Sequence, residues 1–168
     1  MEIALVQKTA LRIKGKQASF VVNPVDTASA NAALILDETI PEINTEETVI
    51  LRGPGDYEIG GVKITGIRGE KGVVYSLTVD GIAIVVGKID TLSAMQQKLK
   101  DHNIVLALCK EVASGAFLTT LAENSVIMYG EKAAETAQGF EKEKLKTMNK
   151  YTASAGKLPA EVEIVLLA

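Results

Sequence analysis

Tryptophan is absent from this sequence of 168 residues, and aromatic residues make up only 4% of it. Proteins that hold single-stranded nucleic acid stack its bases on aromatic side chains, so this composition argues against such a role. Cationic charge is not in excess either, because 18 Lys and Arg stand against 21 Asp and Glu, and the basic residues are scattered. We therefore expect neither nucleic acid nor an anionic membrane surface as a partner.

Cysteine occurs once, at Cys109, so the chain cannot form an internal disulfide. A single cysteine is typical of proteins from a reducing compartment. The N-terminus carries Glu2 where a signal peptide needs positive charge, and its apolar run is too short for a signal core or a membrane span. The sequence thus predicts a soluble cytoplasmic protein.

The overall composition is typical of one globular domain. Hydrophobic residues make up 47% of the chain and charged residues 23%. The length suffices for one sizeable core, and neither a repeat of solenoid length nor a change in composition divides the chain. We expect a single domain over residues 1–168.

The first half of the chain has the pattern of β-strands. Residues 11–14 alternate apolar and basic side chains, which is the period of a strand with one wet face. The continuous apolar run over 31–36 is typical of a strand covered on both faces. Gly53-Pro54-Gly55 lies between the β-prone segments 46–52 and 56–67, and predicts the turn of a hairpin formed by these two segments.

The second half begins with a further hairpin and then alternates helix and strand. Asp80-Gly81 between two β-prone runs predicts a two-residue hairpin turn. Leu92, Met95 and Leu99 recur on one face of a helix over 91–102. Shorter helices are expected over 115–124 and 131–140, and 147–157 is the loosest segment. The expected strands are residues 2–7, 9–14, 18–22, 31–36, 46–52, 56–67, 73–79, 82–87, 103–109, 125–129 and 161–167.

This order predicts an α/β fold with two sheets and outer helices, and three segments sharpen the prediction through a resemblance. GPGDYEIGG, Gly53 to Gly61, resembles the GPGEYEI-type hairpin of the small lactonase-like branch of the metallo-β-lactamase superfamily. Residues 11–26, with Asn23-Pro24, resemble the strand pair of that family, and 157–167 resemble its C-terminal strand. The resemblance implies two facing β-sheets with outer helices, the αββα sandwich, in a short version.

The resemblance also implies that the metal-ligand motif is lost. The family binds zinc through a His-x-His-x-Asp-His loop after a buried strand, with further His and Asp ligands later. Matching 31–36 to that strand puts the loop ligands at Asp37, Thr39, Pro41 and Glu42, none of which is an imidazole. We expect no zinc and no other cofactor. We also expect cationic side chains near the position at which the family binds its metal. The remaining ligand positions fall near Lys8, Lys88 and Gly130.

His102 and Cys109 are the other residues with the chemistry of a base and a nucleophile. A strand of seven residues, roughly 20 Å long, separates them, so they cannot pair directly. We interpret His102 as a polar residue at a helix C-terminus, where the helix dipole favours it. Cys109 is interpreted as a small buried hydrophobe. We assign no catalytic residue.

Carboxylates are the best remaining candidates for chemistry. The acidic loop over 37–47 and two acidic residues beyond it offer the oxygen ligands that magnesium or calcium prefers. The spacing lacks the Asp-x-Asn-x-Asp-Gly pattern that makes such a site specific, so a solvated acidic loop is the simpler interpretation. The candidate ligands of this weaker alternative are Asp37, Glu42, Asp56 and Glu58.

Two functional hypotheses follow. The favoured one is a non-catalytic protein of the metallo-β-lactamase fold that acts as a binding or assembly module, with a partner that the sequence does not identify. A fold can outlive its site, because core burial and site chemistry are separate demands. The alternative is a divergent hydrolase that uses a hard cation or no metal at the acidic loop 37–47, with Asp56 or Glu58 as base. Because a chain this short leaves apolar surface uncovered, a homo-oligomer is also expected.

Overall fold

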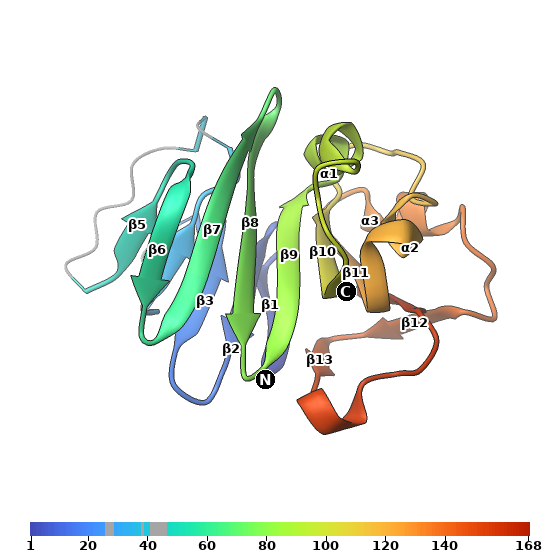
Figure 1. Cartoon of the computed structure of the whole chain (residues 1–168). Helices are drawn as coiled ribbons and strands as arrows, with labels where there is room; N and C mark the ends of the chain where they lie inside the picture. The colour runs from blue at the N-terminus through green and yellow to red at the C-terminus, as the bar shows by residue number, and fades with distance from the viewer. Residues whose placement is uncertain (26–28, 38, 41–46) are drawn as a thin grey trace.

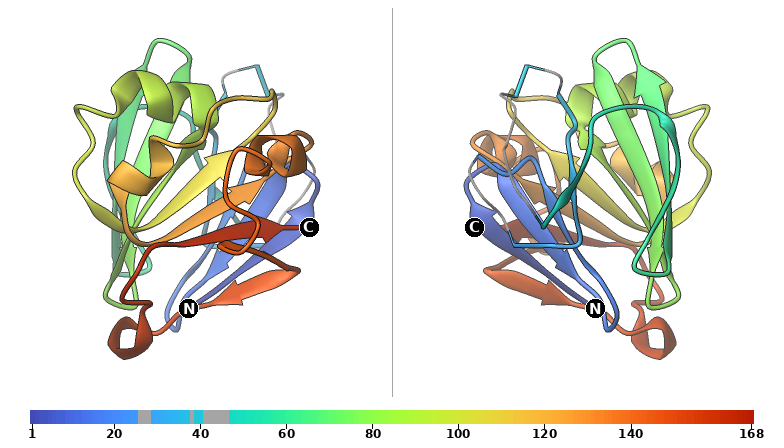
Figure 2. Two further views of the ribbon diagram at one scale, coloured as in Figure 1. Left: turned by 90° about the vertical axis from the view of Figure 1, so that its right-hand side faces the viewer. Right: turned by 90° about the vertical axis from the view of Figure 1, so that its left-hand side faces the viewer.

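Two β-sheets face each other across one apolar layer (Figures 1 and 2). The computed structural model describes residues 1–25, 29–37, 39–40 and 47–168. In these residues one sheet has six strands in the order β13-β1-β2-β3-β4-β5, and the other has eight in the order β12-β14-β11-β10-β9-β8-β7-β6. The predicted two-sheet α/β sandwich is confirmed.

The six-stranded sheet contains most of the N-terminal strands. β1, β2 and β3 are antiparallel neighbours, whereas β3, β4 and β5 run parallel. The predicted alternation in β2 is confirmed, because Leu11 and Ile13 are fully buried while Arg12 and Lys14 are not. The strands of this sheet are β1 (Glu2–Gln7), β2 (Ala10–Lys14), β3 (Ser19–Val22), β4 (Ala32–Leu34), β5 (Val49–Leu51) and β13 (Lys150–Thr152).

The eight-stranded sheet has an antiparallel half and a parallel half. β6 to β9 form an antiparallel meander. β9, β10, β11, β14 and β12 all run parallel, so their carboxyl ends meet at the same edge. The strands are β6 (Gly55–Ile59), β7 (Val62–Gly69), β8 (Gly72–Val79), β9 (Ile82–Lys88), β10 (His102–Leu108), β11 (Ala122–Tyr129), β12 (Leu145–Met148) and β14 (Glu163–Leu167).

The hydroxyl of Tyr75 links the two sheets within the core. Tyr75 on β8 is fully buried, and its Oη donates to the carbonyl oxygen of Leu51 on β5 at 2.8 Å. The carbonyl oxygen of Ile35 lies 3.3 Å from the same hydroxyl. A buried hydroxyl needs such a partner, since an unpaired one costs free energy. The bond therefore fixes the position of the β4 and β5 ends relative to β8.

The helices pack on the outer face of the eight-stranded sheet. In the described part of the chain these α-helices are α1 (Ile89–Met95), α2 (Leu118–Leu121) and α3 (Ala133–Ala137). A 3-10 turn, η1 (Ala155–Lys157), follows β13 and buries none of its residues. α1, α2 and α3 contact strands of that sheet and share its second apolar cluster. α1 is shorter than the predicted 91–102, because after Met95 only Leu99 offers an apolar side chain to bury. Within the described residues, no helix has the length and apolarity of a membrane span.

The turn at Gly53-Pro54-Gly55 does not close a hairpin, so that prediction is wrong. β5 belongs to the six-stranded sheet and β6 to the eight-stranded sheet, so this turn carries the chain from one sheet to the other. The hairpin of this region joins β6 to β7 at Gly60-Gly61, with φ of +57° and +76°. Two successive positive φ values are typical of the turns whose twist fits paired strands. Asp80-Gly81, with φ of +51° and +78°, forms the predicted hairpin turn in the same way.

The segment that contains β12 and β13 was expected to be loose, and this too is wrong. β12 pairs with β14 in one sheet, and β13 pairs with β1 in the other, so residues 145–152 link the two sheets along one side (Figure 1). Of β13 only Tyr151 is buried, where its hydroxyl lies 2.6 Å from Ser125 Oγ. The sequence did not reveal these strands, because β12 and β13 contain too few apolar residues to show the two-residue alternation of a β-strand.

Replacing Gly60 by Ala should destabilise the fold by about 1–2 kcal/mol, because the φ of +57° at this position lies in the left-handed region, which L residues avoid. The added Cβ would also lie 2.8 Å from Ala18 Cβ. The matched control is Gly156→Ala, where nothing lies within 4 Å of the new Cβ. Its effect should stay within about 0.5 kcal/mol. Urea unfolding measures both, and equal midpoints for the two variants would contradict the turn assignment.

Candidate functional site

The candidate site lies where the carboxyl ends of the parallel strands meet. Lys88 is the last residue of β9, and Lys110 follows β10 by two residues. Lys88 pairs in register with Leu108, which places the two lysines on neighbouring strand ends. Asp37 comes from the opposite sheet, three residues after the end of β4. Ligands of parallel sheets bind at this kind of edge, so the three side chains lie where a site is expected.

Both lysines contact one carboxylate oxygen. Asp37 Oδ2 lies 3.4 Å from Lys88 Nζ and 3.5 Å from Lys110 Nζ. The other oxygen, Oδ1, accepts hydrogen bonds from Thr39 N at 3.0 Å and Thr39 Oγ1 at 2.8 Å. The Asp37 and Lys88 side chains are only 18% and 15% exposed, whereas that of Lys110 is 42% exposed. We call Asp37, Lys88 and Lys110 the ion cluster.

The ion cluster stabilises the charged form of Asp37. Partial burial alone would raise the pKa of this carboxyl, but the hydrogen bonds from Thr39 and the ammonium groups of Lys88 and Lys110 lower it from 3.8 to about 2. An ammonium group beside a carboxyl group favours the ionised carboxylate. Asp37 is therefore ionised at neutral pH.

A small cavity of about 210 Å³ opens beside the ion cluster. Leu108, Val112 and Ala113 form part of its apolar wall, and Asp90 and Glu111 add two further carboxylates. The Asp90 side chain is 39% exposed, and its Oδ2 lies 3.9 Å from Lys71 Nζ. The cavity thus carries both signs of charge at short range.

Sequence comparison alone does not place the chain, since no protein-family model and no curated protein matches it. Solved structures do. A Thermotoga maritima protein, provisionally described as a Zn-dependent hydrolase of the metallo-β-lactamase superfamily, matches with a TM-score of 0.66 and 14% identity, over 99% of this chain and 97% of that one. A metallo-β-lactamase fold protein from Bacillus subtilis matches with a TM-score of 0.59 and 7% identity, over 98% and 95%. This chain has the metallo-β-lactamase fold.

A third match has the same fold. It is a protein from Parabacteroides distasonis, provisionally described as a metal-dependent hydrolase, with a TM-score of 0.56 and 14% identity over 96% of this chain and 91% of that one. The identities are low, so the likeness establishes the fold, and the site has to be judged from this chain's own residues.

The positions that correspond to the family's metal ligands carry side chains with other contacts. Thr39 donates two hydrogen bonds to Asp37, and Asp37 also contacts the two lysines. Pro41 and Glu42 lie outside the described residues. Lys88 lies against Asp37 as expected, within hydrogen-bond reach of its carboxylate. Lys8 was expected to be the second cation there, and this is wrong: it is exposed in the β1–β2 turn, and Lys110 lies at the cavity instead.

Gly130, the expected position of the last histidine, has no room for a side chain. It follows β11 with φ of +107°, a conformation that L residues rarely adopt. A Cβ at this position would lie 2.8 Å from the carbonyl oxygen of Cys109 and 2.9 Å from Leu108 Cδ1. An imidazole here would require the backbone to move.

Of the four candidate hard-cation ligands, the three that the structure describes are not brought together. Asp56 and Glu58 lie exposed on β6, the outermost strand of the eight-stranded sheet, and Asp56 Oδ1 accepts a hydrogen bond from Thr65 Oγ1 at 2.9 Å. Asp37 belongs to the ion cluster, and Glu42 falls outside the described residues. In the part of the chain that the structure describes, no three His, Cys, Asp or Glu side chains form a group that could hold a metal ion.

His102 is not at a helix C-terminus, so that interpretation is wrong. It is the first residue of β10, because α1 ends early, and it is only 7% exposed. Its Nε2 lies 2.8 Å from Ser76 Oγ on β8, and burial lowers the pKa of the imidazole. Sequence reasoning missed Ser76, since nothing in its neighbourhood marks it. Neither residue lines the cavity beside the ion cluster.

Cys109 is a buried thiol, which confirms the interpretation as a small hydrophobe. It is 0% exposed, and its Sγ lies 3.7 Å from the carbonyl oxygen of Ala107. Burial raises the pKa of the thiol to about 11. The thiolate is the nucleophilic form, so this cysteine is inert at neutral pH.

Asp37→Asn should lower the free energy of unfolding by about 1–2 kcal/mol at pH 7, because the amide keeps the Thr39 hydrogen bonds but loses the charge. The folded pKa lies below the ordinary value of 3.8, so the stabilisation is complete above pH 4 and is lost as the pH falls toward 2. Denaturant unfolding at pH 7, 4 and 3 should show the difference from wild type shrink. Asp56→Asn, at an exposed carboxylate, is the control, and an equal loss there would contradict the role of the ion cluster.

Proposed function

We propose that this protein is a non-catalytic form of the metallo-β-lactamase fold and works as a binding or assembly module. The observation that carries the proposal is the ion cluster. Lys88 and Lys110 place two ammonium groups against the one described carboxylate at the expected metal-ligand loop. The positive charge that a metal ion would supply to Asp37 is supplied by the chain itself.

Electrostatics supports this reading. Two unit charges 4 Å apart interact by about 4 kcal/mol at the effective dielectric of a protein surface, and the repulsion doubles for a divalent ion. A metal approaching Asp37 Oδ2 meets two such ammonium groups, at 3.4 and 3.5 Å from that oxygen. A protonated lysine has no lone pair to offer as a ligand. The metal would have to displace both lysines and replace their bonds.

Exposed apolar side chains are available for a binding role. Among the described residues, Val6, Val25 and Val49 are 45%, 70% and 47% exposed. All three lie on or beside the six-stranded sheet, and the α-helices of the described part pack on the other one. Exposed valines of this kind can contribute to a contact face between proteins when they form part of a larger apolar patch.

The alternative function is a divergent hydrolase. It is favoured by the likeness to two proteins provisionally described as metal-dependent hydrolases, and by the acidic composition of loop 37–47. Such an enzyme would use a hard cation or no metal. The metal content of the protein separates the two functions.

Protein purified without chelator should contain far less than one zinc per chain, and zinc or magnesium added in a calorimetric titration should give no saturable heat. The reason is that Lys88 and Lys110 already neutralise Asp37. Lys88→Asp is the informative variant, because it removes one ammonium group and adds a carboxylate. It should gain divalent-cation affinity by about tenfold or more. Near-stoichiometric zinc in the wild type, lost in Asp37→Ala, would support the hydrolase instead.

Self-association is a second prediction of the module hypothesis. Gel filtration with light scattering should give a mass above that of the 17.8 kDa chain at micromolar concentration. Val25→Glu with Val49→Glu should shift the protein to monomer, since charge opposes burial of this face. Val112→Glu, at a valine that is 56% exposed beside the ion cluster, is the control. A wild-type monomer throughout would count against self-association.

A further inference from the structure

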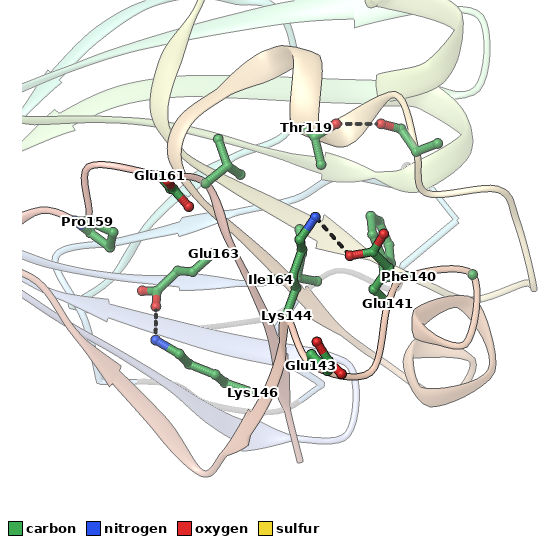
Figure 3. A pocket seen from close by; sticks show the side chains of 13 residues that line it. Thr119, Phe140, Glu141, Glu143, Lys144, Lys146, Pro159, Glu161, Glu163 and Ile164 are labelled. Carbon is green, nitrogen blue, oxygen red and sulfur yellow. Dashed lines mark hydrogen bonds and ion pairs between the residues drawn. The ribbon is translucent and has the colours of Figure 1, made fainter.

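A groove in the described part of the molecule lies remote from the ion cluster (Figure 3). It has a volume of about 760 Å³ and is lined by residues that precede or begin β12 and β14, together with Ala116 and Thr119 beside α2. β12 and β14 run parallel to β9 and β10 within one sheet. Residues at their amino ends therefore lie at the opposite edge from Lys88 and Lys110.

The groove combines an apolar wall with an acidic rim. Phe140, Val162 and Ile164 supply apolar surface. Four glutamates line the groove against two lysines. Each lysine is already paired: Lys144 Nζ lies 2.8 Å from Glu141 Oε2, and Lys146 Nζ lies 2.6 Å from Glu163 Oε2 (Figure 3).

The two remaining glutamates give the groove its net negative charge. Among the described residues, Glu143 and Glu161 have no ion-pair partner within 4 Å. The two lysines that line the groove form their ion pairs with the other two glutamates. A cationic occupant would therefore find two carboxylates to pair with, at no cost to existing ion pairs.

The groove also borders an open sheet edge. β12 is the outermost strand of the eight-stranded sheet and pairs on one side only, with β14. Its Lys146 lines the groove, and both Lys146 and Thr147 are exposed. An edge strand presents unpaired N–H and C=O groups to any extended segment that approaches it.

We infer that this groove binds an extended segment of a partner protein in which apolar residues alternate with lysine or arginine, added as a strand along β12. The inference deepens the proposed binding function and rests on it. Apolar side chains of the segment pack on Phe140, Val162 and Ile164, and its cations pair with Glu143 and Glu161. A second copy of this chain fits less well, because the chain itself has a net charge of −3.

The probe for this inference is a fluorescein-labelled ten-residue peptide of alternating valine and lysine, measured by fluorescence anisotropy with the full chain. Binding should be saturable at micromolar peptide and weaken as salt rises, because charge pairing contributes. Glu161→Lys and Glu143→Lys should each weaken it about tenfold. Glu58→Lys, an identical charge change on the exposed β6, should weaken it less than about twofold.

Two further peptides separate the parts of the inference. A valine–glutamate peptide should not bind, and equal binding would overturn the charge assignment. A valine–lysine peptide with alternate backbone nitrogens methylated keeps its charge but loses its strand hydrogen bonds, so it should bind at least about tenfold more weakly. Equal affinity for it, or equal effects of Glu161→Lys and Glu58→Lys, would overturn strand addition in this groove. Zinc content tests the proposed function separately. A protein that contained zinc and still bound the peptide would refute the non-catalytic function but not the peptide site.

Discussion

Burial of one apolar layer between two sheets is the constraint on which the rest of this molecule depends. The layer takes side chains from both sheets, and the Tyr75 hydroxyl ties the β4 and β5 ends to β8 inside it. The layer includes Leu36 and Leu108, which lie next to the ion cluster, but none of the three charged side chains of the cluster. The core is therefore built from apolar side chains, and the charged groups of the ion cluster are not part of it.

The ion cluster stabilises its edge of the eight-stranded sheet with charges of the chain itself. Loop 37–40 brings a carboxylate to the ends of β9 and β10, where a lone partly buried charge would be costly. Lys88 and Lys110 neutralise it, and Thr39 satisfies its second oxygen. Under the proposed binding function, the acidic groove at the far edge of the same sheet is the surface that meets the partner.

Features encoded locally could be predicted from the sequence, whereas features that depend on long-range pairing could not. The sequence Asp80-Gly81 is sufficient to predict its hairpin turn. The absence of histidine from the loop that corresponds to the family's ligand loop can be read directly from the sequence. The turn at 53–55 is also visible, but which sheet each flanking segment joins depends on distant partners. Lys110 reaches Asp37 across 73 residues of chain, and Ser76 reaches His102 across 26, so neither contact leaves a local signal.

The central claim is that lysine ammonium groups occupy the electrostatic role of the metal at Asp37. The backbone amide of Thr39 reports on it directly, because this amide donates to Asp37 Oδ1. In an NMR titration with zinc at pH 7, the chemical shift of that amide should stay unchanged throughout, including above one equivalent of metal. A saturable shift that is complete near one equivalent, and that disappears in Asp37→Asn, would show that a metal displaces the lysines and would contradict the account.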